Sequence, residues 1–440
     1  MAPWIIRVAW AMTILIWPTI VHAQAGQSID WWYGRGANPG QQRALDDALV
    51  APFNTVHPGR KLDIEFRGSI VDRQIRIALL SGVGPDIVMA PGPSYLVPME
   101  AAGYLLPLDD YARKYGWDRT VIPQILKIGT YGGHLYAVPR TDETMGLFFD
   151  RALFARNGWS APKTLDELEA LATSMMAKGI IPFGAGNADW RGANEWYITL
   201  VLNHFAGPDK VRAALQGKLA WTDPVFVQAI TLLQRWYRKG WFGKTYFTLT
   251  NEQGFAQIAD GNAGMSPNGF WAFQWVTAHF AARSADLGVE PFPTLRSGVP
   301  YPVFAVGVGS TLSINSRAKD PDAAASVIDA MLNPAFYQRI NKGWPGDWNL
   351  PINGVDDAAL ATNTSPQYAK IVTGLTRALA DGHYGYATWA FWPPATEQYL
   401  INGIEQVWLG QMTPEAYLQQ VDKTFQIELK QGRVPPVPGG

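Results

Sequence analysis

The sequence alternates short apolar runs with amphipathic stretches. Residues 62–66 alternate apolar and polar side chains at period two, as a half-buried strand does. Residues 28–33 predict an earlier strand, and residues 41–57 and 71–81 predict helices. Strands that alternate with helices in this way predict an α/β protein whose helices flank its sheets.

Capping residues mark the beginnings of several predicted helices. Thr164 and Glu167 form a capping box, in which each side chain satisfies a free backbone donor. Residues 223–224, 320–321 and 413–414 each place a capping side chain before a proline at the first helical position. The helix after Thr164 carries an apolar stripe at helical spacing, formed by Leu165, Leu168, Leu171 and Met175.

The N-terminus has the pattern of a secretory signal peptide. Arg7 supplies positive charge, residues 8–21 are almost wholly apolar, and a small-x-Ala sequence ending at Ala23 precedes Gln24. The apolar segment is short for a transmembrane span, and no stop-transfer pattern follows it. We therefore expect residues 1–23 to be removed during export.

Length, charge and cysteine content narrow the classes of function. The 440 residues are enough for two ordinary domains, and the net charge of −1 without a basic cluster argues against a nucleic-acid partner. The chain has no cysteine, so disulfides and thiol ligands are excluded. The six histidines lack metal-ligand spacing, and no P-loop, nucleophile elbow or zinc-protease motif occurs. No metal and no cofactor is expected.

Tryptophan is abundant, with 19 residues, and many of these large rings should lie in the core. Others occur beside Gly, Asp and Glu in loop-like sequence. A sugar ring presents C–H faces that pack on aromatic rings, and hydroxyls whose burial without a partner costs about 1–3 kcal/mol each. A mixture of Trp with Asp, Glu, Arg and Asn in loops is therefore what a carbohydrate site needs.

Several motifs follow one another in the order of a known family. They are YGGHLYAVP at 131–139, GLFFDRALFARNG at 146–158, APKTLDEL at 161–168, AAGYLLPLD at 101–109, and DGNAGM followed by NGFW within 260–271. Together they resemble the maltose-binding-protein-like family 1 of extracellular solute-binding proteins, which serve sugar ABC transporters. The resemblance covers nearly the whole mature chain.

This resemblance implies a type II periplasmic binding protein fold. Such a fold has two lobes, each with a central mixed sheet flanked by helices, and a hinged cleft between them. Because the chain crosses between the lobes more than once, each lobe is discontinuous. We expect an N-terminal lobe of residues 24–139 and 300–347, a C-terminal lobe of residues 140–299 and 348–433, and a flexible tail of residues 434–440.

The first candidate ligand contacts lie at strand ends and at the first crossing. Trp32 and Arg35 follow the first strand, where either side chain could touch a ligand. Asp142 and Glu143 lie at the predicted crossing. By resemblance, Glu143 matches an acidic position that faces the cleft in the family, and a salt bridge in the hinge is the alternative.

A polar and aromatic loop supplies four more candidates, which are Asp189, Trp190, Glu195 and Trp196. Glu195 and Trp196 match a ligand-contacting loop of the family, with an ordinary solvated loop as the alternative. Trp271 matches the Gly-x-Trp position whose ring stacks on sugar, with core packing as the alternative. The remaining candidates are Trp344 and Asp347, in a stretch that departs from the family pattern, and Trp392, in a late aromatic cluster.

The sequence therefore predicts a binding protein that captures a mono- to oligosaccharide by hinged closure and is not an enzyme. Its expected partner is the permease of an ABC importer in the inner membrane. The absence of a lipid-anchored cysteine after the signal predicts a location in the periplasm, and a monomer is expected. Two alternatives stay open. One is a secreted glycoside-active enzyme with a carboxylate pair among Asp142, Glu143, Asp189 and Glu195. The other is a binding protein for a polyol, a glycerol phosphate or a polyamine.

Overall fold

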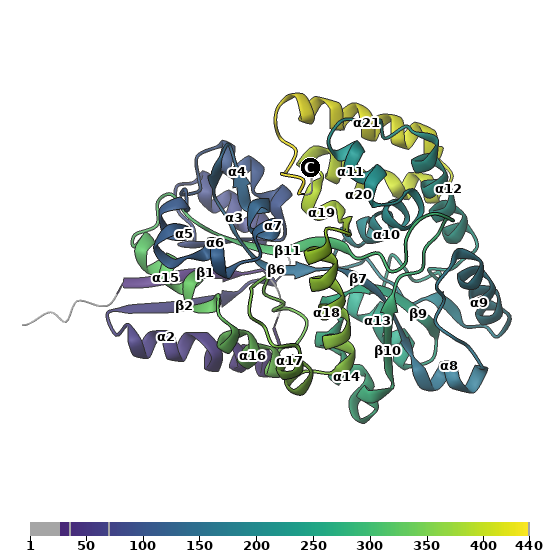
Figure 1. Cartoon of the computed structure of the whole chain (residues 1–440), viewed down its shortest axis with the longest axis horizontal. Coiled ribbons are helices and arrows are strands. Elements are labelled where there is room, and N and C mark those ends of the chain that lie inside the picture. Colours follow the sequence, from purple (N-terminus) through teal and green to yellow (C-terminus); the bar gives the residue numbers. More distant parts are fainter. Residues whose placement is uncertain (1–26, 35–36, 69–70, 439–440) are drawn as a thin grey trace, which may run out of the picture.

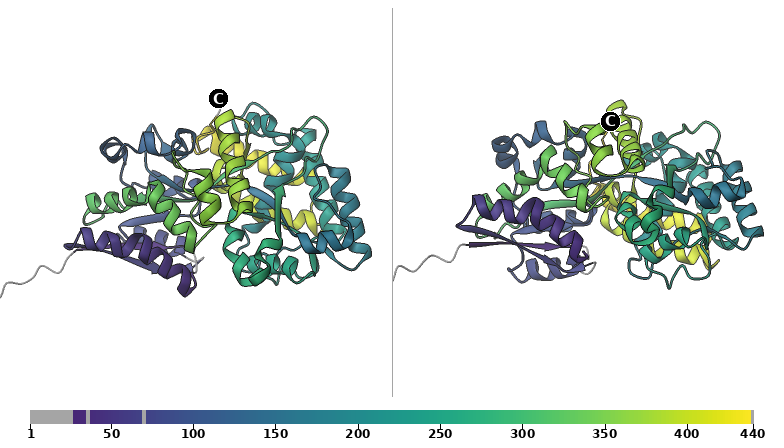
Figure 2. Two further views of the ribbon diagram at one scale, coloured as in Figure 1. Left: turned by 60° about the horizontal axis from the view of Figure 1, so that its bottom comes forward. Right: turned by 90° about the horizontal axis from the view of Figure 1, so that it is seen from below.

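The computed structural model describes residues 27–34, 37–68 and 71–438. The expected signal peptide and Arg35 lie outside the described residues. Figure 1 shows two parts joined near the middle of the molecule, and Figure 2 shows the same arrangement from two further sides. Each part is built on one sheet.

The larger sheet has six strands in the order β12-β11-β3-β1-β2, with β6 paired to β11. β1 runs parallel to β2 and β3, whereas β11 runs antiparallel to β3 and β6, so the sheet is mixed. Its strands are β1 (Gln27–Tyr33), β2 (Arg60–Phe66), β3 (Ile87–Ala90), β6 (Val138–Glu143), β11 (Ala305–Ile314) and β12 (Gly385–Tyr386).

The smaller sheet has four strands in the order β10-β7-β9-β8. β7 pairs antiparallel with β9 and β10, and β8 pairs parallel with β9. Its strands are β7 (Met145–Asp150), β8 (Ile181–Phe183), β9 (Ala263–Gly269) and β10 (Leu287–Pro291). The short strands β4 (Thr130–Tyr131) and β5 (His134–Leu135) form a separate hairpin.

Helices cover both sheets (Figure 1). The earlier ones are α1 (Pro39–Leu45), η1 (Asp46–Val50), α2 (Ala51–Val56), α3 (Val71–Leu80), η3 (Pro93–Tyr95), α4 (Val97–Ala101), α5 (Asp109–Tyr115), α6 (Trp117–Thr120), α7 (Pro123–Leu126), η4 (Lys127–Gly129), α8 (Arg151–Asn157), α9 (Leu165–Ala177) and α10 (Ala193–Val201). The middle ones are η5 (Leu202–Ala206), α11 (Pro208–Leu215), α12 (Pro224–Arg238), α13 (Asn251–Ala259), η6 (Phe270–Trp275), α14 (Val276–Phe280) and η7 (Ala281–Asp286). The last are α15 (Pro321–Met331), α16 (Pro334–Gly343), α17 (Asp357–Asn363), α18 (Pro366–Asp381), α19 (Thr388–Phe391), α20 (Pro394–Trp408) and α21 (Pro414–Lys430).

The helix starts predicted from capping residues are confirmed. Thr164 accepts the backbone N–H of Glu167 and begins α9, and the side chains of Asp223, Asp320 and Thr413 cap α12, α15 and α21. Three of the four stripe residues of α9 are buried, namely Leu168, Leu171 and Met175. No helix within the described ranges is long and apolar enough to cross a membrane.

The chain passes from one sheet to the other within a single residue. β6 ends at Glu143 in the larger sheet, and β7 begins at Met145 in the smaller one. In Figure 1, β6 and β11 run across the centre of the molecule between its two parts. Side chains at the carboxyl end of β6 therefore lie where the two parts meet.

The predicted tail begins where α21 has ended. Residues 434–438 lie against the core, with Pro435 and Pro438 buried. Tyr386 donates a hydrogen bond of 3.2 Å to the carbonyl of Pro438. Residues 439–440 lie outside the described residues.

Candidate ligand-binding cleft

A cavity of about 470 Å³ lies between elements of the two sheets. The part with the larger sheet contributes four segments to the walls of this cavity: the end of β1, the segment after β3, the end of β6 and the middle of β11. From the other part come loops and helices around β9, together with α19. Its walls are Gly34, Gly68, Pro91, Tyr95, Glu143, Asp189, Trp190, Glu195, Trp196, Thr250, Asn251, Glu252, Trp271, Gln274, Trp275, Gly309 and Trp389. We call this cavity and its extension, described next, the cleft.

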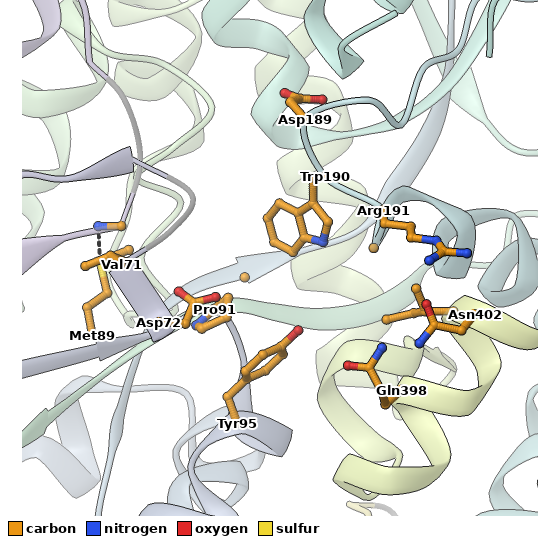
Figure 3. A pocket seen from close by; sticks show the side chains of 14 residues that line it. Val71, Asp72, Met89, Pro91, Tyr95, Asp189, Trp190, Arg191, Gln398 and Asn402 are labelled. Atoms are coloured by element: carbon orange, nitrogen blue, oxygen red, sulfur yellow. Dashed lines mark hydrogen bonds between the residues drawn. The ribbon is translucent and has the colours of Figure 1, made fainter. Parts of the chain in front are cut away.

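The extension is an adjoining cavity of about 260 Å³, bounded by α3 and α20. Tyr95 and Trp190 line both cavities. In Figure 3 the side chain of Trp190 points into the cavity from one side, and the Tyr95 ring lies opposite it. Gln398 and Asn402 of α20 line a further side of the same cavity. The cleft is therefore elongated.

Three tryptophan rings form one wall of the larger cavity. The rings of Trp196 and Trp271 lie 4.7 Å apart between centroids at 42°, and the ring of Trp389 meets Trp271 edge to face at 6.2 Å. All three are largely buried, so neighbouring side chains hold their ring planes in place. A rigid aromatic wall offers a ligand apolar area at little cost in side-chain entropy.

Two glycines leave the space that cleft side chains occupy. A Cβ atom on Gly269 would lie 2.1 Å from the Trp271 ring. A Cβ atom on Gly309 would lie 1.8 Å from Oε1 of Glu143, and Gly309 stands at an irregularity in the pairing of β11 with β6. Bulges of this kind often re-aim side chains beside functional sites. Here the Glu143 carboxylate lies against Gly309, and both residues line the cleft.

The carboxyl groups of the cleft differ in their surroundings. Asp189 is exposed and accepts the backbone N–H of Asn251 at 3.0 Å. Glu195 is only 1% exposed, and its Oε2 accepts the Thr388 hydroxyl at 2.8 Å. Burial raises the pKa of Glu195 to about 8, and its hydrogen bonds oppose that rise. Burial therefore favours the protonated form of this carboxyl group.

Six of the residues predicted from the sequence come together in this cleft. They are Glu143, Asp189, Trp190, Glu195, Trp196 and Trp271. Trp32 lies outside the lining, half-buried, with the Arg67 guanidinium 3.5 Å from the centroid of its ring. Arg35 lies outside the described residues.

Asp142 and Asp347 lie in a buried network beside the crossing strands rather than among the cleft residues. Arg140 donates to the Asp347 carbonyl at 2.9 Å and lies within 3.4 Å of its carboxylate. Asn349 donates to the Asp142 side chain, and Asp142 donates its backbone N–H to the Asn349 carbonyl. Burial raises the pKa of Asp142 to about 7. The network ties β6 to residues 347–349.

Trp344 and Trp392 are fully buried in aromatic clusters. Trp344 lies beside Tyr33, with ring centroids 5.6 Å apart. Trp392 lies on Trp221 at 4.9 Å. Neither ring is among the residues that line the cleft.

Sequence reasoning missed several cleft residues, including Tyr95, Trp275 and Trp389. Tyr95 carried a usable signal, because it lies in a Gly-Pro segment directly after the buried strand β3. Trp389 belonged to the cluster from which Trp392 was chosen. Trp275 carried no signal that separated it from a core residue.

The arrangement suits binding through ring faces and hydrogen bonds. It combines five indole rings with carboxyl, amide and hydroxyl groups, as a polar ligand with apolar faces requires. Within the described ranges, no group of three His, Asp or Glu side chains could hold a metal ion.

Comparison with known proteins adds to this geometry. The sequence model described as "Bacterial extracellular solute-binding protein" matches residues 36–338, more than half of the chain. The diacetylchitobiose binding protein NgcE of Streptomyces coelicolor is 24% identical over 76% of this chain and 75% of its own. The alpha-glucosides-binding periplasmic protein AglE of Rhizobium meliloti is 26% identical over 61% of each chain.

A solved structure from work on xylan utilization by the thermophilic bacterium Caldanaerobius polysaccharolyticus has the same fold. Its TM-score is 0.78 at 21% identity, and the match covers 90% of this chain and 99% of that one. At this identity the likeness concerns the fold alone. It confirms the two-lobed α/β architecture predicted from the sequence.

Proposed function

The chain belongs to the bacterial extracellular solute-binding protein family, and on that premise we propose that its cleft captures a carbohydrate for delivery to an ABC importer. The ligand is a mono- to oligosaccharide. Two relatives are named for binding diacetylchitobiose and alpha-glucosides, which supports this ligand class.

The observation that carries the proposal is the chemistry of the cleft wall. The rings of Trp196, Trp271 and Trp389 offer flat surfaces to the C–H faces of a sugar. Glu143 and Asp189 line the cavity with hydrogen-bonding groups for hydroxyls. The extension along α20 gives room for a second ring beyond Trp190.

Isothermal titration calorimetry with a sugar panel tests the proposal. N,N′-Diacetylchitobiose, maltose, xylobiose and their constituent monosaccharides are suitable probes, with spermidine and glycerol 3-phosphate as members of other classes. We expect one site per chain and binding by at least one sugar. Binding by spermidine or glycerol 3-phosphate alone would move the ligand to that class.

We infer that the chain binds its ligand without converting it. The family consists of binding proteins, and a glycosidase would need two carboxyl groups placed on either side of a glycosidic bond. Prolonged incubation of the purified protein with the sugar that it binds should leave that sugar intact in chromatography. Hydrolysed product above a buffer control would instead identify a glycoside-active enzyme.

The proposed setting is the periplasm, where a monomer would hand its ligand to the permease subunits in the inner membrane. The N-terminal pattern at residues 1–23 supports export through a cleaved signal. Mass spectrometry of the protein released by osmotic shock should give a mature chain that begins at or near Gln24. Retention of residues 1–23 in a membrane fraction would count against this setting.

The lobe boundaries predicted from the sequence also stay a proposal. They place residues 24–139 and 300–347 in one lobe and residues 140–299 and 348–433 in the other. The change of sheet between β6 and β7 and the network of Arg140 with Asp347 support crossings close to these positions. Limited proteolysis with and without the bound sugar would locate the segments that move.

A further inference from the structure

A further cavity, of about 550 Å³, lies apart from the cleft. Its walls come from the first turn of α11, from the chain between β10 and β11 within residues 296–303, and from residues 382–386 at β12. We call it the α11 cavity. It has no lining residue in common with either cavity of the cleft, so the two sites can be occupied at the same time.

The described walls of the α11 cavity carry more cations than carboxylates. Lys210, Arg212 and Arg296 line it, whereas Asp209 is the one carboxyl group among its lining residues and lies 2.9 Å from Arg212. Arg296 donates Nε and Nη2 to two backbone carbonyls of η5, at 2.7 and 3.0 Å. Neutral carbonyls hold the guanidinium in place without cancelling its charge, so a positive charge is fixed at this wall.

The N-terminal turn of α11 adds to this positive potential. Pro208, Asp209 and Lys210 of this turn line the cavity. The N-cap residue is Gly207, which has no side chain to accept from the backbone N–H groups that begin the helix. These N–H groups and the helix dipole favour a negative charge at this end.

A buried tyrosine adds a hydrogen-bond donor to the same cavity. Tyr384 lines it with only 4% of its surface exposed. Its hydroxyl has no hydrogen-bond partner among the described residues, and it is not among the polar atoms that are sealed away from open space. The neighbouring Tyr386 differs, because it donates its hydroxyl proton to the Pro438 carbonyl at 3.2 Å. The Tyr384 hydroxyl is therefore held at the cavity with a proton to donate.

Much of the remaining wall is apolar. Val299, Pro300, Pro302 and Val303 line the cavity from the segment before β11, and Pro208 lines it from α11. An inorganic ion would satisfy the charged groups and leave these side chains without a contact. An anion that carries an apolar body would use both kinds of wall.

We propose that the α11 cavity is a second binding site, which takes a small organic phosphate. The phosphate group would lie at Lys210, Arg296 and the Tyr384 hydroxyl, and the apolar body would lie against the valines and prolines. A phosphate offers three terminal oxygens to donors from several directions, whereas a carboxylate offers two. The proposal does not depend on what the cleft binds.

The first experiment is calorimetry of the full mature chain with phenyl phosphate, which joins a phosphate to a small apolar ring. We expect a Kd below about 1 mM, weaker binding of inorganic phosphate, and no binding of phenol. No binding of phenyl phosphate would overturn the proposal, as would equal binding of phenol. Binding of benzoate in place of phenyl phosphate would reject a phosphate site, and equal affinity for inorganic phosphate would indicate an adventitious ion only.

The second experiment assigns the bound phosphate to the α11 cavity. Tyr384→Phe removes only the hydroxyl and should weaken the Kd for phenyl phosphate by about fivefold or more. Lys210→Gln removes one exposed charge and should weaken it by about threefold or more, and added NaCl should weaken wild-type binding. Tyr104→Phe and Lys218→Gln, outside the cavity, are the matched controls and should bind as wild type does.

An unchanged Kd for phenyl phosphate in both Tyr384→Phe and Lys210→Gln would overturn the proposal, because the phosphate would then lie elsewhere, for example in the cleft. Neither residue lines the cleft, so both variants should bind the tightest-binding sugar of the panel with the wild-type Kd. If no sugar binds at all, the proposed function fails, while the titrations with phenyl phosphate still decide whether the α11 cavity is a site.

Discussion

Trp271 shows how one side chain can both pack in the core and line the cleft. Its ring is 6% exposed and packs on Trp196, yet it also lines the cleft. Gly269 leaves the space that the ring fills. A ring fixed in this way presents a wall of constant shape, which is what stacking on a sugar face requires.

Trp271→Ala should weaken sugar binding by about 1–3 kcal/mol, from lost ring contact and lost apolar burial. That corresponds to about 5- to 150-fold in Kd. Calorimetry and the thermal unfolding midpoint should both be measured. The control is Trp117→Ala. Trp117 lies in the core of the part built on the larger sheet, so this variant should lower the midpoint without changing the Kd. An unchanged Kd together with a lowered midpoint in Trp271→Ala would assign Trp271 to the core.

Asp142 illustrates a residue whose charge state follows from burial. Its pKa rises to about 7 from an ordinary value of 3.8, so the folded chain holds a proton that the unfolded chain releases. This difference in proton binding stabilises the folded chain. Its stabilisation is present in full below about pH 3.8 and is lost as the pH rises to about 7. Between these values Asp142 makes the protein less stable at higher pH, by on the order of 4 kcal/mol in total.

Asp142→Asn should remove this contribution to pH dependence. The Asn side chain can still accept from Asn349, so the contact is kept without an ionisable group. The unfolding midpoint of wild type should fall more between pH 5 and pH 8 than that of the variant. Asp110→Asn, at an exposed site on α5, should follow wild type. Parallel profiles of Asp142→Asn and wild type would show that Asp142 does not titrate in this range.

At the scale of elements, β11 leaves the space that the Glu143 carboxylate of β6 occupies. Gly309 lies at the irregular pairing with β6, directly against the Glu143 carboxylate. Because Glu143 is buried, the carboxylate has little room to move aside. The position of one glycine in a strand thus controls one hydrogen-bonding group of the cleft.

Gly309→Ala should displace the Glu143 carboxylate from the space that the new methyl group takes. We expect a loss of sugar affinity of about tenfold or more, equivalent to about 1.4 kcal/mol. Gly59→Ala is the matched control, because no heavy atom lies within 4 Å of a Cβ built there. The Kd of each variant is measured by calorimetry. Binding by Gly309→Ala that equals the control would remove Glu143 from the contacts to ligand.

The sequence predicted helices better than it predicted which tryptophan lines the cleft. Caps such as Thr164 are local and chemically explicit, so α9 could be located from sequence. Whether Trp389 or Trp392 lines the cleft depends on where α19 ends. The helix stops at Phe391 and Trp392 continues in an extended conformation, which turns its ring toward Trp221. Such orientation depends on tertiary packing, which spacing alone does not encode.

At the scale of the molecule, the cleft is formed by segments that are distant in sequence. β1, β3, β6 and β11 contribute from one sheet, and α10, η6 and α19 from the other part. The family resemblance made the meeting of these segments predictable, because the order of motifs is specific even where each motif is weak. A ligand that touches both parts favours the closed arrangement only by its higher affinity for that arrangement.

Closure should be visible as a shorter distance between α3 and α20, the two helices that bound the extension of the cleft. Arg76 of α3 and Gln398 of α20 are exposed and line the same small cavity. The chain has no cysteine, so Arg76→Cys together with Gln398→Cys gives two unique positions for spin labels. The distance distribution from pulsed electron paramagnetic resonance should shift to shorter values and narrow when the tightest-binding sugar of the panel is added. The control pair is Gln398→Cys on α20 and Glu415→Cys on the neighbouring helix α21. The distance between these two labels should not change when the sugar is added. If the first pair keeps its apo distribution at saturating sugar, capture takes place without hinged closure.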